Sequence, residues 1–113
     1  MEGEDPATTY DSVVLALEAG YRHFDLAEHY KTQGHVGRAL AFKSDDIPRD
    51  QVWLTNKIDG LPCGDYAAVR ARVEAMCKEC GVTGFDLLLI HYPLAAGTDL
   101  NGDPGALSTP AAW

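Results

Sequence analysis

The chain has 113 residues, of which 46% are hydrophobic and 23% are charged, so it fits one folded globular domain and does not have a disordered composition. Its net charge of −8 disfavours nucleic acid and anionic membrane surfaces as partners, and no apolar run approaches the roughly 20 residues of a membrane span. The acidic segment after Met1 has no apolar signal core, and three cysteines form no disulfide framework, so we expect a cytoplasmic protein with free thiols.

The first half of the chain predicts a helix, a strand and a second helix. The first helix is expected to begin at Asp5-Pro6, an N-cap residue followed by proline, and to end at Gly20. Its apolar face carries residues spaced four and three apart: Tyr10, Val14 and Leu17. An aromatic strand over 21–25 follows, and then a short helix over 35–42 whose apolar side carries Val36, Ala39 and Leu40.

The second half continues this alternation. A turn at 47–50 leads into a strand over 52–55 that ends near Lys57. After a loop at 61–64, Asp65 caps a third helix, which ends at Gly81 and has an apolar stripe made of Val69, Val73, Met76 and Cys80. Residues 85–90 predict a third strand with a continuous apolar end. Helices that alternate with apolar strands indicate an α/β fold with a parallel sheet covered by helices.

Both ends of the chain look cut. The sequence begins on a helix with no strand before it, and a loop over 95–108 is followed by Thr109-Pro110, which predicts the start of another helix. The chain stops at Trp113, within the first turn of that helix. We therefore expect residues 1–113 to be one incomplete domain, either a fragment or an incomplete gene model.

Polar side chains mark the points where the predicted strands end. Asp25 ends the first strand with Tyr30 five residues further on, Lys57 ends the second strand, and His91 ends the third. Because the carboxyl ends of parallel strands share one face, where active sites are built, these side chains are predicted to converge. Each also has a purely structural interpretation, as a cap, a solvated strand end, a packed aromatic or a polar tip. Only their joint occurrence favours a site.

The chemistry of this set is coherent. A tyrosine hydroxyl gives up its proton reluctantly near neutral pH, and an ammonium such as that of Lys57 would favour the phenolate. The carboxylate of Asp25 would keep that ammonium charged and in place, and a neutral His91 could hydrogen-bond and orient a carbonyl. The set suits proton delivery to a carbonyl oxygen while hydride arrives at the carbon.

Two other features have structural explanations. Cys77 and Cys80 form a C-x-x-C, but they lie at the end of an amphipathic helix, so core packing is favoured and no metal site is expected. His23 and His29 lie near the predicted site without a motif of their own, and His23 is expected to face a neighbouring layer of the fold.

Three segments resemble signatures of the aldo-keto reductase family. The first runs over 20–25, from Gly20-Tyr21 to Phe24-Asp25, and continues through Ala27, Tyr30, Val36-Gly37 and Ala39-Leu40. The second is Leu54-Thr55-Asn56-Lys57, an apolar strand that ends in lysine. The third is Leu87-Leu88-Leu89-Ile90-His91-Tyr92-Pro93. The resemblance covers the chain from about Asp5 to Trp113, and the joint pattern is specific although no single segment is.

The resemblance implies a partial parallel (β/α)₈ TIM barrel, of which this chain supplies three strands and three helices. It implies an oxidoreductase that reduces aldehydes or ketones to alcohols by hydride transfer from NADPH. Tyr30 would be the proton donor, Lys57 would favour its ionisation, and Asp25 would hold Lys57 and approach the nicotinamide ribose of NADP. His91 would orient the substrate carbonyl.

The chain also departs from the family pattern. Thr32-Gln33 stands where the family usually has Asn-Glu, and Asp59 stands where an aromatic often follows the lysine. The family's first barrel strand and the later segments that hold most of the cofactor have no counterpart, so we expect this chain alone to be inactive. The alternative is a truncated or non-catalytic aldo-keto-reductase-like module that binds a nucleotide or a protein partner.

Overall fold

Three parallel strands form one sheet, in the order β1 (His23–Asp25), β2 (Trp53–Ile58) and β3 (Leu87–Ile90). The computed structural model describes residues 6–59 and 65–92. Helix α1 (Pro6–Glu18) precedes β1, while α2 (Gln33–Phe42) and α3 (Tyr66–Cys80) connect the successive strands. The predicted alternation of helices with a parallel sheet is confirmed. The predicted segments at 61–64, 95–108 and 109–113 lie outside the described residues.

Short helical turns replace two of the expected irregular segments. Residues Glu28–Tyr30 form the 3₁₀ turn η1, which was expected to be loop, and Arg49–Gln51 form the turn η2 within the predicted turn region. Lys31 closes η1 in the left-handed conformation, at φ 58°. The backbone N–H of Tyr30 donates to the carbonyl of Ala27, 3.1 Å away, so the position of Tyr30 is set by local backbone hydrogen bonds.

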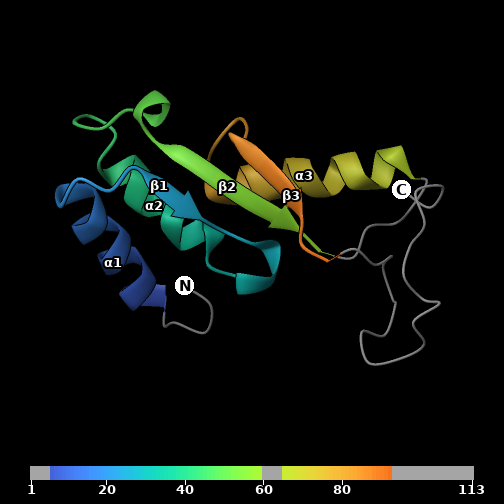
Figure 1. Ribbon diagram of the computed structural model, residues 1–113, viewed down its shortest axis with the longest axis horizontal. Helices are drawn as coiled ribbons and strands as arrows, with labels where there is room; N and C mark the ends of the chain where they lie inside the picture. Colours follow the sequence, from blue (N-terminus) through green and yellow to red (C-terminus); the bar gives the residue numbers. More distant parts are fainter. Residues whose placement is uncertain (1–5, 60–64, 93–113) are drawn as a thin grey trace.

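One face of the sheet packs on the helices. In Figure 1 the strands pass in front of α2 and α3. Side chains alternate along each strand, and those on this face are buried: Phe24, Leu54 and Ile58. Phe24 and Leu54 join a core cluster to which the helices contribute Val13, Leu17, Val36, Ala39 and Cys80. The opposite face carries the exposed side chains of His23, Asp25 and Trp53.

The buried face of α1 differs from the prediction. Val13 and Leu17 are each 1% exposed and Thr9 is 0% exposed, while Tyr10 and Val14 are only half-buried beside the core. Leu17 is buried as predicted, and Tyr10 and Val14 pack against the core, but the most buried side chains of α1 also include Thr9 and Val13, each one position before a predicted residue. The apolar stripe predicted for α3 is confirmed, since two of its residues, Met76 and Cys80, are buried.

Helices α2 and α3 approach each other closely at Gly37. A Cβ atom at Gly37 would lie 2.0 Å from the backbone carbonyl oxygen of Cys80, so only glycine fits there. Gln33, four residues earlier on α2, is buried, and its amide accepts from Asn56 Nδ2 at 3.0 Å and donates to Glu79 Oε2 at 2.8 Å. Gln33 therefore links both helices to β2.

Strand β3 is less covered than the sequence predicts. Its four residues are between 39% and 49% exposed: Leu87, Leu88, Leu89 and Ile90. The expectation of an apolar strand buried by helices is therefore wrong for the described part of the chain, in which β3 forms the edge of the sheet. No helix within residues 6–59 and 65–92 is long and apolar enough to cross a membrane.

Candidate active site

The carboxyl ends of the three strands bring the predicted side chains together. Asp25 is the last residue of β1, Lys57 lies at the end of β2, and His91 directly follows β3. The parallel register pairs Lys57 with Leu89, and the backbone N–H of His91 donates to the carbonyl of Ile58 at 3.0 Å. Backbone pairing therefore places His91 beside the end of β2.

The ammonium of Lys57 lies between a carboxylate and an aromatic ring. Its Nζ atom is 2.5 Å from Asp25 Oδ1 and donates to the carbonyl of Leu26 at 3.0 Å. The same nitrogen is 5.0 Å from the ring centroid of Tyr30. The Lys57 side chain is only 14% exposed, so a charge of fixed position is held beside the tyrosine. An ammonium in such a place favours an anionic form of a neighbouring group.

Tyr30 and His91 complete the group. Their ring centroids are 6.0 Å apart with the planes at 89°, an edge-to-face arrangement. The His91 ring also stacks on Tyr92, with centroids 4.5 Å apart. All four predicted site residues are thus neighbours in the structure, and we call them the tetrad: Asp25, Tyr30, Lys57 and His91.

A second group of charged residues supports the tetrad. Asp59 Oδ1 lies 2.9 Å from His91 Nδ1, and the backbone N–H of Asp59 donates to Glu28 Oε1 at 3.2 Å. The guanidinium of Arg72, on α3, donates to the same Glu28 carboxylate. The sequence prediction assigned none of these residues to the site. Asp59 follows the end of β2 at Ile58, so the alternation of side chains along the strand does not indicate where its carboxylate points.

The remaining sequence features are structural. His23 lies on the open face of the sheet, where Nε2 is 2.9 Å from Thr55 Oγ1. Cys80 is 2% exposed, and burial raises the pKa of its thiol to about 11, which confirms core packing. Burial likewise raises the pKa of Cys77. Among residues 6–59 and 65–92, no three His, Cys, Asp or Glu side chains are grouped as metal ligands would be.

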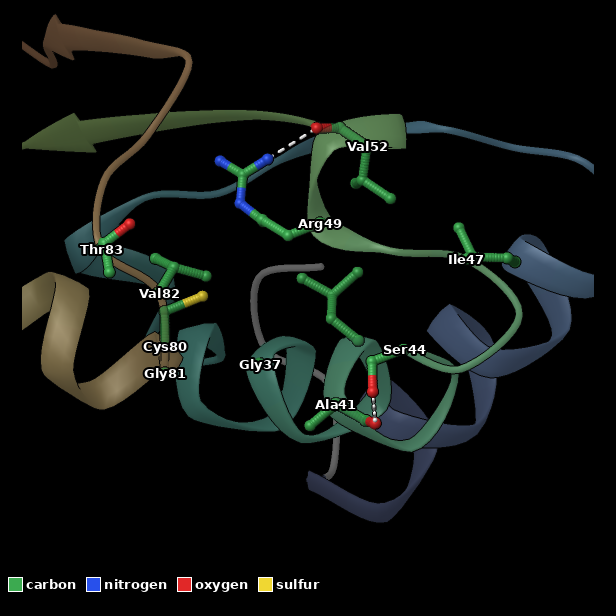
Figure 2. Close-up of a pocket in the computed structure, with 11 residues that line it drawn as sticks. Gly37, Ala41, Ser44, Ile47, Arg49, Val52, Cys80, Gly81, Val82 and Thr83 are labelled. Atoms are coloured by element: carbon green, nitrogen blue, oxygen red, sulfur yellow. Dashed lines mark hydrogen bonds between the residues drawn. The ribbon is translucent and has the colours of Figure 1, made fainter.

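A pocket at the other end of the sheet has no chemistry of this kind. It lies between α2, η2 and the turn after α3, where β2 and β3 begin (Figure 2). Its cationic residue, Arg49, donates to the carbonyls of Val52 and Gly84 at 2.6 Å and 3.0 Å and to Asp86 Oδ2 at 2.9 Å. These bonds tie the entrances of two strands together, so Arg49 has a structural role.

Comparison with known proteins identifies the family. The model of the aldo/keto reductase family matches residues 2–98. The chain belongs to this family. It is similar to the aldehyde reductase YPR1 of Saccharomyces cerevisiae, at 37% identity over 101 residues, which are 89% of this chain and 31% of the relative. It is also similar to the NADP-dependent D-sorbitol-6-phosphate dehydrogenase of Malus domestica, at 33% identity over 97 residues, which are 84% of this chain and 30% of that enzyme.

The fold agrees with a solved member of the family. The aldose reductase of Giardia lamblia superposes with a TM-score of 0.76 and 31% identity, covering 91% of this chain and 34% of that structure. The predicted partial TIM barrel is thereby confirmed. This chain spans about a third of the length of its relatives, 31% of the yeast enzyme and 34% of the Giardia structure.

Proposed function

We propose that this chain forms part of an NADPH-dependent carbonyl reductase in which Tyr30 donates the proton. The observation that carries this proposal is the position of the Lys57 ammonium, 2.5 Å from the Asp25 carboxylate and 5.0 Å from the Tyr30 ring centroid. A cation held in this way lowers the cost of forming a phenolate, which is what a tyrosine must become after it gives up a proton.

The residues at the strand ends fit the nicotinamide ribose of NADPH. The Asp25 side chain is 60% exposed, and Lys57 is bonded to one of its two carboxylate oxygens, Oδ1. The other oxygen can accept a hydrogen bond from a ribose hydroxyl. NADPH would supply hydride to the carbonyl carbon, and the NADP dependence named for the Malus domestica relative supports this cofactor.

The proton transfer follows from the same geometry. As hydride reaches the carbonyl carbon, the Tyr30 hydroxyl transfers its proton to the carbonyl oxygen, which gives the alcohol and leaves a phenolate. Lys57 stabilises that phenolate, while Asp25 and the Leu26 carbonyl hold the ammonium. His91, edge-to-face with Tyr30, contacts and orients the substrate oxygen. All four side chains of the tetrad are in place, and this favours catalysis over a non-catalytic module.

The direct test is reduction of a simple aromatic aldehyde by the complete barrel enzyme that contains this chain. NADPH consumption is followed by its absorbance, and the alcohol product is identified. We expect one alcohol formed for each NADPH consumed, and slower turnover with NADPH deuterated at the transferred position. An enzyme that binds NADPH but reduces none of a panel of aldehydes and ketones would contradict the proposal.

A further inference from the structure

The carboxylate of Asp59 faces two imidazole rings at the exit of β2. Oδ1 is 2.9 Å from Nδ1 of His91, and Oδ2 is 3.7 Å from Nδ1 of His29. The side chains of Asp59 and His91 are only 25% and 17% exposed, so surrounding water weakens their contact less than it would weaken a surface pair.

Backbone hydrogen bonds hold both partners of this contact. The His91 N–H donates to the carbonyl of Ile58 at 3.0 Å, directly before Asp59 in the chain. The Asp59 N–H donates to Glu28 Oε1 at 3.2 Å, and Arg72 binds that carboxylate from α3. These hydrogen bonds fix the backbone of both residues in the Asp59–His91 contact, unlike in an ion pair between two mobile surface side chains.

The contact decides which nitrogen of His91 carries a proton. An ionised carboxylate only accepts hydrogen bonds, so Nδ1 must be protonated to bond with it. In a neutral ring, Nε2 is then without a proton and can only accept. Nε2 in that state can accept a bond from an alcohol hydroxyl, but it cannot donate to a carbonyl oxygen. Only the doubly protonated ring can donate from Nε2 while Nδ1 remains bonded to Asp59.

We propose that Asp59 is a positioning residue that fixes the Nδ1–H form of His91. Nε2 can then donate a hydrogen bond to the carbonyl oxygen only when the ring is doubly protonated. This inference rests on the proposed function, and it revises the sequence-based expectation of a neutral histidine that orients the carbonyl. Lower pH then favours carbonyl reduction, and higher pH favours alcohol oxidation.

Other titratable groups also face His91. Tyr92 stacks on the ring, and the rings of Tyr30 and His29 lie at 6.0 Å and 6.3 Å between centroids. Lys57 lies on the Tyr30 ring and is paired with Asp25. Asp59 is the carboxylate that contacts the ring directly, and it therefore distinguishes Nδ1 from Nε2.

The first arm of the test reads the ring itself. Nitrogen-15 spectra of histidine-labelled complete enzyme distinguish Nδ1–H, Nε2–H and doubly protonated rings. We expect neutral His91 to be protonated at Nδ1 in the unmodified enzyme and to shift towards Nε2–H in Asp59→Ala. Asp46→Ala, at an exposed position after α2, is the matched control and should leave the spectrum of His91 unchanged. A neutral His91 that is protonated at Nε2 in the unmodified enzyme would overturn the inference.

The second arm measures kcat/KM for an aldehyde and for its alcohol as pH is varied between 5 and 9. Above the point where His91 loses its second proton, the aldehyde value should fall about tenfold per pH unit. In Asp59→Ala this decline should disappear, because a neutral ring can then donate from Nε2.

If the alanine variant does not fold, Asp59→Asn is the alternative. It keeps the shape of the side chain, and its amide can donate to Nδ1, so the decline should again be lost. An unchanged profile in the folded variant would contradict the inference. Absence of aldehyde reduction in the unmodified enzyme would instead contradict the proposed function, and the spectra would still decide the state of His91.

Discussion

The ammonium of Lys57 lies 2.5 Å from Asp25 Oδ1, and this contact joins the carboxyl ends of two neighbouring parallel strands. The two partners differ in accessibility, since the Lys57 side chain is 14% exposed and that of Asp25 is 60% exposed. The lysine thus faces the interior of the tetrad, while the carboxylate remains open to a ligand. Replacement of each residue should therefore impair the enzyme in a different way.

Replacement of Lys57 should mainly affect turnover. Lys57→Met removes the charge beside Tyr30, so kcat of the complete enzyme should fall by about 10²-fold or more while NADPH still binds. Asp25→Asn should weaken NADPH binding as well as turnover, because the carboxylate serves both the lysine and the ribose. Steady-state kinetics and NADPH fluorescence titrations separate the two effects. Lys78→Met, at an exposed position of α3, is the control and should match the unmodified enzyme. Equal kcat in Lys57→Met and Lys78→Met would contradict the role of Lys57.

The contact between α2 and α3 should not tolerate a side chain at Gly37. A Cβ atom there would lie 2.0 Å from the backbone oxygen of Cys80, so Gly37→Ala must push the helices apart. Overpacking of this kind typically costs about 1–3 kcal/mol in the free energy of unfolding. Gly34→Ala in the same helix is the matched control, since its Cβ would meet its nearest atom at an ordinary 3.5 Å. Urea unfolding should show a lower midpoint for Gly37→Ala and an unchanged or higher one for Gly34→Ala. Equal midpoints for the two variants would contradict this packing.

The thiol of Cys80 should be unreactive in the folded protein. Burial raises its pKa from 9.0 to about 11, so at pH 8 very little of the nucleophilic thiolate is present. Because the folded-state pKa is raised, the protonated thiol is favoured in the folded protein. The contribution of Cys80 to the free energy of unfolding is therefore fully present below pH 9 and is lost as pH rises to about 11. Alkylation with iodoacetamide, mapped by peptide mass spectrometry, should label Cys80 only after unfolding in urea. Labelling of Cys80 in the native state as fast as in urea would show that it is accessible.

The sequence predicted the tetrad because its members lie where consecutive parallel strands end, and such ends meet at one edge of a sheet. That reasoning needs only chain order, so it placed Asp25, Lys57 and His91 correctly. It could not predict that Asp59 turns towards His91, because that contact depends on side-chain directions after the strand has ended. The hydrogen bond between Arg72 and Glu28 could not be predicted from the sequence pattern either, since it joins residues 44 positions apart.

Errors in the predicted elements have equally specific causes. The most buried side chains of α1 lie one position before the predicted Tyr10 and Val14, at Thr9 and Val13, and Thr9 was not expected to be buried because it is polar. The turn η1 went unpredicted because three residues are too few for a helical repeat to be recognised. The exposure of β3 could not be inferred from its sequence, because a run of apolar residues is compatible with both a central strand and an edge strand.

The central claim is that Tyr30 donates the proton, and Tyr30→Phe in the complete enzyme tests it most directly. The substitution keeps the aromatic ring beside Lys57 and His91 but removes the acidic hydroxyl, so NADPH should bind as before. Aldehyde reduction, followed by NADPH absorbance, should fall by about 10²- to 10⁴-fold, the usual contribution of general acid catalysis. Tyr21→Phe, at a tyrosine that is 66% exposed, is the matched control and should retain full activity. Near-normal turnover by Tyr30→Phe would contradict the assignment of Tyr30 as the acid.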